Sequence, residues 1–170
     1  GLMTRDEYLE VLSSRIEAVQ TTPGRLVQPL SLASFDAWIK LYRPDENSIN
    51  AAMSYYTKGA VVAFLLDARI RSATNGAASL DDVLRTAYDQ YSQERGFTSD
   101  EIQQTIERVA GTSLADFWPT AIDGTTELDY ALALETFGLH FKSAPVPGEG
   151  GAETKPWLGI GTRNDAGRLV

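Results

Sequence analysis

Two adjacent phenols and a nearby lysine are the side chains of this sequence whose chemistry is hardest to explain by packing alone. Tyr55, Tyr56 and Lys58 come directly before residues 60–66, the longest apolar run of the chain. A helix through these residues would place the tyrosine hydroxyls at the edge of a buried region. There, a neutral donor about 3 Å from a reacting oxygen can stabilise the negative charge of a transition state. The alternative is that both tyrosines are half-buried packing residues with solvated hydroxyls.

Other catalytic motifs are missing from the sequence. His140 is the single histidine, whereas catalytic zinc usually takes two or three nitrogen ligands, often from H-E-x-x-H on a helix. We therefore expect no metal site in this chain and interpret His140 as a partly exposed strand residue. The sequence has no cysteine, which excludes disulfides and thiol catalysis. Gly159-Ile160-Gly161 lacks the third glycine and following helix of a dinucleotide-binding loop.

The chain is acidic, with a formal net charge of −8. Such a charge repels nucleic acid and anionic membranes. No apolar run reaches the roughly 18 to 20 residues that span a bilayer. We therefore expect neither a nucleic-acid partner nor a membrane span, while the compartment, cytoplasmic or exported, stays open.

Helices are the elements expected to position the two phenols. Thr4 and Glu7 predict a capping box, and apolar residues at helical spacing follow until Pro23-Gly24. Residues 24–34 are expected to be extended or irregular. A short amphipathic helix is predicted over residues 35–42.

The helix that carries the phenols is predicted from about residue 50 to residue 74. Asn75-Gly76 suits its left-handed C-cap. Because residues 60–66 are apolar on every side, this helix is expected to be the central element. Further helices are predicted after capping pairs at Ser79 with Asp82 and Thr98 with Glu101, then a short one after Ser113 and a last one over residues 128–137.

The composition changes after residue 142. Residues 143–156 are rich in glycine and proline, which is typical of a linker. Residues 157–160 have the pattern of a strand, and residues 164–167 that of a turn into a second strand. The sequence thus predicts an all-α bundle of six or seven helices over residues 1–142, followed by a linker and a short β hairpin over residues 157–170.

Residues 56–59, Tyr-Thr-Lys-Gly, fit the Tyr-x-Lys-Gly signature of the gluzincin zinc aminopeptidases. The wider order of motifs resembles the bacterial glycyl aminopeptidase family over roughly residues 4–142. The other motifs that carry this resemblance include Tyr8-Leu9-Glu10, Pro23-Gly24-Arg25, Ser34-Phe35-Asp36-Ala37-Trp38, Ser79-Leu80-Asp81-Asp82-Val83, Gly96-Phe97-Thr98 and Gly138-Leu139.

The resemblance implies a parent enzyme that removes N-terminal glycine or alanine from peptides. In that family a thermolysin-like domain binds zinc, and the helical bundle and a PDZ-like domain follow. The resemblance makes Tyr56 the hydroxyl that contacts the oxyanion opposite zinc, with Tyr55 a weaker candidate. It leaves Lys58 and Gly59 structural: an ion-pairing or snorkelling lysine, and a site of close helix approach.

The same resemblance places the zinc ligands and the general base upstream of residue 1. The fragment alone is therefore expected to bind no zinc and to cleave nothing. Residues 157–170 would be the truncated start of the PDZ-like domain. In the parent, the upstream zinc-binding domain and a peptide substrate are the expected partners. An apolar face exposed near Tyr55 and Tyr56 would favour a homodimer of the isolated chain.

Two other hypotheses stay open. The bundle could be a non-catalytic scaffold or peptide-binding module of a degenerate homologue. It could also be an unrelated helical bundle, in which case Tyr56 would be buried away from any cleft.

Overall fold

The computed structural model describes residues 2–142, 164–165 and 168–169. The described part contains seven α-helices and two further helical turns, in agreement with the predicted all-α domain. None of its helices is long and apolar enough to cross a membrane. The α-helices are α1 (Arg5–Thr21), α2 (Leu30–Phe35), α3 (Ser48–Ala51), α4 (Tyr55–Ala73), α5 (Leu80–Tyr91), α6 (Ser99–Ala110) and α7 (Ala131–Phe137), and the turns are the 3-10 helix η1 (Pro23–Leu26) and the π-helix η2 (Trp118–Ile122).

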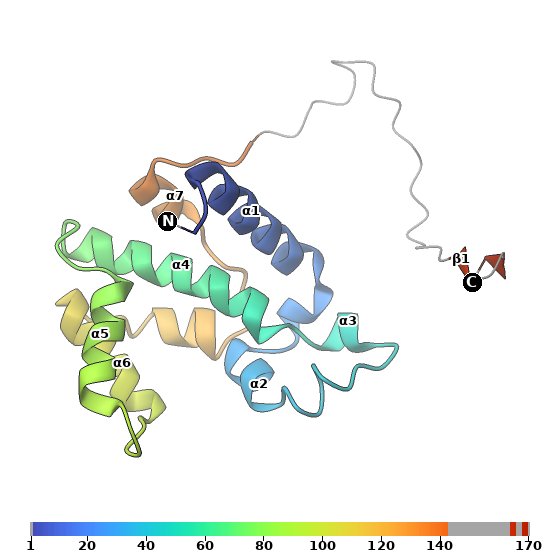
Figure 1. Cartoon of the computed structure of the whole chain (residues 1–170), viewed down its shortest axis with the longest axis horizontal. Helices are drawn as coiled ribbons and strands as arrows, with labels where there is room; N and C mark the ends of the chain where they lie inside the picture. The colour runs from blue at the N-terminus through green and yellow to red at the C-terminus, as the bar shows by residue number, and fades with distance from the viewer. Residues whose placement is uncertain (1, 143–163, 166–167, 170) are drawn as a thin grey trace. The chain divides into compact units, whose positions relative to one another are not determined.

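The long helix α4 is the centre of the helical unit, Gly1–His140, as its apolar sequence predicts. Figure 1 shows α1 and α7 on one side of α4, and α5 and α6 on the other. Fully burying a Val, Leu, Ile or Phe side chain contributes about 1.5–3 kcal/mol, so this helix provides much of the core. Its buried apolar residues are Val61, Val62, Phe64, Leu65, Leu66, Ala68 and Ile70.

Reciprocal capping fixes the starts of three helices. At α1, the Thr4 N–H donates to the Glu7 carboxylate (2.6 Å) and the Glu7 N–H donates to the Thr4 hydroxyl (3.3 Å). Each such cap satisfies backbone donors that a helix leaves unpaired. The predicted capping pairs are confirmed at all three positions: Thr4 with Glu7, Ser79 with Asp82, and Thr98 with Glu101.

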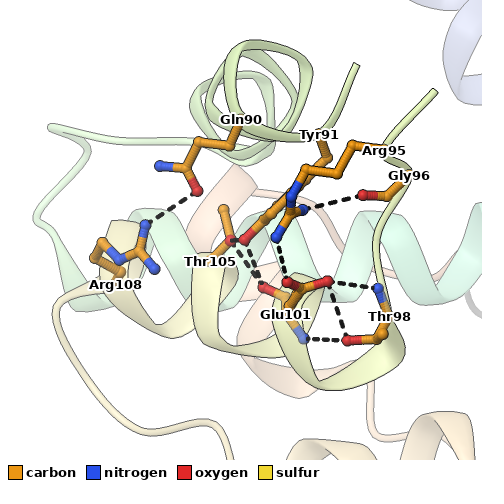
Figure 2. A network of polar contacts seen from close by, with 8 residues as sticks. All are labelled: Gln90, Tyr91, Arg95, Gly96, Thr98, Glu101, Thr105 and Arg108. Atoms are coloured by element: carbon orange, nitrogen blue, oxygen red, sulfur yellow. Dashed lines mark hydrogen bonds and ion pairs between the residues drawn. The ribbon is translucent and has the colours of Figure 1, made fainter. Parts of the chain in front are cut away.

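The hairpin of α5 and α6 is held by a polar network (Figure 2). The Arg95 guanidinium donates to the Glu101 carboxylate (Nη2–Oε1, 2.6 Å) and lies over the Tyr91 ring, 4.8 Å from its centroid. The Tyr91 hydroxyl is 2.9 Å from the hydroxyl of the fully buried Thr105. Thr105 in turn donates to the Glu101 carbonyl at 2.8 Å. The network joins the end of α5 to the first turns of α6, as Figure 2 shows.

The segment that leads toward the phenols differs from the prediction. Helix α2 begins at Leu30, inside the stretch predicted to be irregular, directly after Pro29, whose φ is −59°. Proline is suited to a helix start because its φ is already set and its missing N–H is not needed there.

The predicted helix over residues 35–42 is wrong. After α2 ends at Phe35, the chain forms successive turns, and the Tyr42 N–H donates to the Ala37 carbonyl (3.0 Å). Short helices depend on tertiary packing of their apolar face. Here Phe35 and Trp38 are 84% and 78% exposed, so the apolar spacing leads to no burial within this chain.

The helix predicted over residues 50–74 is divided into α3 and α4. Residues 52–54 interrupt it, and Ser54, in an extended conformation, becomes the N-cap of α4 by accepting the Thr57 N–H (3.4 Å). Serine competes with the helix backbone for hydrogen bonds, which makes it a better cap than an interior residue. At the other end, Asn75 and Gly76 adopt the predicted left-handed conformation.

The last two predicted helices are also changed in extent. Turns and the π-helix η2 replace the short helix predicted after Ser113, and α7 begins at Ala131 instead of residue 128. Gly138, at the end of α7, is left-handed as its predicted cap role requires.

A second unit comprises Phe141–Val170. Within it, β1 (Asn164–Asp165) pairs antiparallel with β2 (Arg168–Leu169), with Asn164 opposite Leu169. The predicted linker over residues 143–156 and the predicted first strand over residues 157–160 lie outside the described residues. The predicted hairpin and PDZ-like start therefore stay predictions.

Candidate functional site

The start of α4 presents a cluster of three phenols, which we call the phenol cluster: Tyr42, Tyr55 and Tyr56. Tyr55 and Tyr56 are the first two residues of α4, and their ring centroids are 4.1 Å apart. The Tyr42 hydroxyl reaches both, at 3.3 Å from the Tyr55 hydroxyl and 3.1 Å from the Tyr56 hydroxyl. The structure thus brings together the two predicted site residues and adds a third.

Tyr56 is the most exposed member of the phenol cluster. It is 58% exposed, against 48% for Tyr42, whereas Tyr55 is half-buried. The hydrogen bond described for the Tyr56 hydroxyl runs to the side chain of Tyr42 and not to backbone. The hydroxyl is therefore accessible to a molecule that approaches the start of α4.

A close backbone contact fixes where α4 begins. Gly24 in η1 is buried, and a Cβ added to it would lie 2.0 Å from the Ala52 carbonyl oxygen, a distance that no real Cβ contact tolerates. In addition, the buried side chain of Gln28 accepts the Met53 N–H at 2.9 Å. These two contacts hold residues 52–53 against the turn after α1, and so position the phenols that follow.

Hydrogen bonding within the phenol cluster shifts its titration. The pKa of Tyr56 is lowered from its ordinary value of 10.0, first by the hydrogen bond with Tyr42 and then by that with Tyr55, while partial desolvation opposes the shift. The pKa of Tyr55 is raised, mainly by its hydrogen bonds with Tyr42 and Tyr56. Tyr56 is therefore the phenol whose anion its neighbours stabilise. The N-terminus of α4 adds a favourable partial positive charge for negative charge nearby.

Lys58 is a buried lysine near the start of α4. It is 1% exposed, so its amine does not reach water. Its Nζ atom has no hydrogen-bond partner among the described residues. Burial lowers the pKa of this lysine, and the nearby Glu127 carboxylate only partly opposes that shift. Glu127 instead forms its close ion pair with Arg25, at 2.7 Å.

The glycine of the signature, Gly59, does not lie against a close neighbour in this chain. A Cβ added there would meet only the Leu30 Cδ1 atom, at 3.9 Å, which is an ordinary van der Waals contact. The close helix approach expected at this position is therefore absent from the described part of the chain.

The described residues do not form a zinc site. No group of three or more His, Cys, Asp or Glu side chains among them could hold a metal ion. A shallow hollow of about 510 Å³ is lined by Thr57 of α4 and by residues of α1, among them Glu10 and Arg15.

The comparisons with known proteins relate this chain to peptidases. The family model of the M61 glycyl aminopeptidases matches residues 1–62, about the first third of the chain. The relationship predicted from the motifs is thereby confirmed, and the matched range includes all three members of the phenol cluster. The predicted PDZ-like start lies outside the match. No curated protein matches the chain.

Proposed function

We propose that this chain is the helical part of a zinc-dependent aminopeptidase that removes N-terminal glycine or alanine from peptides, and that Tyr56 stabilises the oxyanion of the reaction. The observation that carries the proposal is the exposed Tyr56 hydroxyl in the first turn of α4, inside the region that matches the M61 family. The same residue, buried or tied to backbone, would be unsuited to this role.

The chemistry follows from the position of the phenol. Attack of water on a peptide carbonyl places negative charge on the carbonyl oxygen. In its neutral form, the Tyr56 hydroxyl would donate a hydrogen bond to that oxygen at about 3 Å. Tyr55, half-buried behind Tyr56, remains the weaker candidate for the same donation. The zinc of the parent enzyme would polarise the carbonyl and activate the water, and its ligands would come from residues other than those described.

Tyr56→Phe in the parent enzyme tests this role. We expect kcat to fall by about 10²–10³, with little change in KM, because the lost interaction forms only in the transition state. Steady-state hydrolysis of glycyl and alanyl peptides would measure both constants. Tyr55→Phe is the matched control, and it should lower kcat much less. Near-normal kcat in Tyr56→Phe, with the zinc content unchanged, would remove the role.

The 170-residue chain itself provides a second control. With zinc added, we expect it to hydrolyse no aminoacyl substrate and to bind no zinc at catalytic affinity. Hydrolysis by the purified chain would show that the reaction does not need residues outside it.

An exposed apolar surface borders the phenol cluster. It comprises Leu32, Phe35, Trp38 and Ile39, and the Trp38 ring lies 5.2 Å from the ring of Tyr42. Large apolar patches of this kind mark contact surfaces. In the parent we assign this surface to the zinc-binding domain, which would bring the metal toward Tyr56. In the isolated chain we expect a second copy to cover it.

The competing function is a non-catalytic scaffold or peptide-binding module. The same exposed apolar surface is the feature that favours it, since a bound peptide could cover these side chains. The two functions differ at the oxyanion: a scaffold would bind peptides equally well with phenylalanine at position 56.

A further inference from the structure

Tyr42 is the member of the phenol cluster that the signature does not contain. It comes from the turns after α2, thirteen residues before Tyr55 in sequence, yet its hydroxyl lies within hydrogen-bonding distance of both phenols on α4. The centroid of its ring lies 5.2 Å from that of Trp38. A side chain that is contacted at both its ring and its hydroxyl is suited to orient another.

The number of protons on the three hydroxyls restricts which phenol can donate a hydrogen bond to which. Each phenol has one proton to donate and can accept as well. If Tyr56 is to donate to a reacting oxygen, its proton cannot also be given to Tyr42. Tyr42 must then donate to Tyr56, and Tyr55 must donate to Tyr42. When both contacts of Tyr42 are made as hydrogen bonds, the order that leaves the Tyr56 proton free is therefore Tyr55 to Tyr42 to Tyr56.

Resting on the proposed function, we infer that Tyr42 is a positioning residue: its hydroxyl accepts from Tyr55 and donates to Tyr56, which leaves the exposed Tyr56 proton for the oxyanion. Hydrogen bonds in a chain polarise one another, so each donation strengthens the next. Tyr56 is more exposed than Tyr55, so the end of the hydrogen-bond chain that has the free proton is also the end that faces solvent.

The direction of the pKa shifts supports this order. The bond with Tyr42 is the largest influence on both phenols, and it lowers the pKa of Tyr56 while it raises that of Tyr55. A phenol that accepts loses its proton more easily, and a phenol that donates holds its proton more firmly. Tyr42 and Tyr55 are the only titratable groups among the described residues that contribute to the shift of Tyr56. Two cations lie close to Tyr42 in sequence: Arg43 follows it directly, and Lys40 is paired with Asp36 at 2.7 Å.

The test is a titration of the individual tyrosines in this chain, which needs no enzymatic activity. Tyrosine labelled with 13C at Cζ gives one NMR signal for each residue, and its shift follows ionisation. In Tyr42→Phe, which keeps the ring and removes only the hydroxyl, we expect the pKa of Tyr56 to rise and that of Tyr55 to fall. Tyr88→Phe, an exposed residue on α5, is the matched control and should leave both unchanged.

A second variant tests the direction in which the hydrogen bonds are donated. Tyr55→Phe should raise the pKa of Tyr56 less than Tyr42→Phe does, because the donation from Tyr42 survives. Unchanged pKa values in Tyr42→Phe, or a larger effect from Tyr55→Phe, would overturn the inference. If circular dichroism shows that Tyr42→Phe is unfolded, Tyr55→Phe is compared with the unmodified chain instead. A pKa of Tyr56 that is lower in Tyr55→Phe than in the unmodified chain would contradict the order Tyr55 to Tyr42 to Tyr56.

The parent enzyme gives an independent readout. Tyr42→Phe should lower kcat by about 2- to 12-fold, the effect of one ordinary hydrogen bond, with KM retained. An inactive Tyr56→Phe together with unaltered titration in Tyr42→Phe would reject the inference and keep the proposed function. Near-normal kcat in Tyr56→Phe, together with the expected pKa changes in Tyr42→Phe, would keep the order of the hydrogen bonds and reject the catalytic role of the phenols.

Discussion

At the scale of the residue, Lys58 has the most unusual environment in the described part of the chain. An amine with 1% exposure and no hydrogen-bond partner costs free energy whether it is charged or neutral, because its bonds to water are not replaced. Its four-carbon stem contributes packing in the core of α4. The stem therefore stabilises the fold while the nitrogen opposes it.

Replacing this nitrogen should stabilise the chain. We expect Lys58→Met to raise the free energy of unfolding by about 1–3 kcal/mol at neutral pH, since methionine keeps most of the volume and removes the desolvated polar atom. Urea denaturation would measure this. Burial lowers the pKa of Lys58 from 10.5, so the unfolded chain binds more protons than the folded chain between the two values. The advantage of methionine should therefore shrink as the pH rises toward 10.5.

The matched control for Lys58 is Lys40→Met. Lys40 is half-exposed and paired with Asp36 one helical turn away in sequence. Exposed pairs of this kind contribute at most about 1 kcal/mol, so Lys40→Met should be nearly neutral. A clear loss of stability in Lys58→Met would mean that the amine has a favourable partner in the folded chain.

At the scale of the element, the hairpin of α5 and α6 depends on the charge of Glu101. Its carboxylate accepts the Thr98 N–H and pairs with Arg95. The Thr98 backbone bond, followed by Arg95, lowers the pKa of Glu101 from its ordinary value of 4.5. The stabilisation is thus present above pH 4.5 and is lost as the pH falls through the lowered pKa.

Glu101→Gln should show this dependence. At about pH 7 the variant should unfold at a lower temperature than the unmodified chain. The difference between the two unfolding temperatures should narrow below about pH 4, because the unmodified chain then loses the same charge. Thermal unfolding followed by circular dichroism across this range would measure it. Glu94→Gln, an exposed residue before the network, is the control and should change little at either pH. A difference in unfolding temperature that does not change with pH would mean that the loss of stability comes from the altered packing of the side chain and not from its lost charge.

The elements also show where sequence reasoning succeeds. Capping pairs and left-handed turn residues act through neighbours in the chain, so Thr4, Thr98 and Gly138 mark helix ends correctly. The helix predicted over residues 35–42 failed because its apolar spacing implied a core that these residues do not contact. Tyr42 was missed as a site residue for a related reason: its place beside Tyr56 depends on the turns after α2, which no local pattern predicts.

At the scale of the whole molecule, the exposed apolar surface of Leu32, Phe35, Trp38 and Ile39 determines how the chain meets other molecules. Through the contact of Trp38 with Tyr42, this surface is continuous with the phenol cluster. Whatever covers it will also approach Tyr56. The helical class and the relationship to M61 peptidases could be predicted from the sequence, but the exposure of this surface depends on which partner is present.

We expect the isolated chain to form dimers through this surface. Replacing Phe35 and Trp38 together with serine should shift the chain toward monomer, because these side chains are the most exposed large apolar groups of the surface. Sedimentation velocity over a range of concentrations would measure the shift. Leu84→Ser, an exposed apolar residue on α5, is the control. Monomers at every concentration of the unmodified chain would contradict the expectation.

The close contact between Gly24 and the Ala52 carbonyl positions the phenols although neither residue has a side chain that could react. A methyl group at position 24 would push residue 52 away and move the start of α4, which carries Tyr55 and Tyr56. By contrast, Gly59, which belongs to the signature, has room for such a group in this chain. Natural variation at position 24 would thus displace the phenols without replacing any of them. Under the proposed function, such a change would lower activity although every proposed site residue is retained.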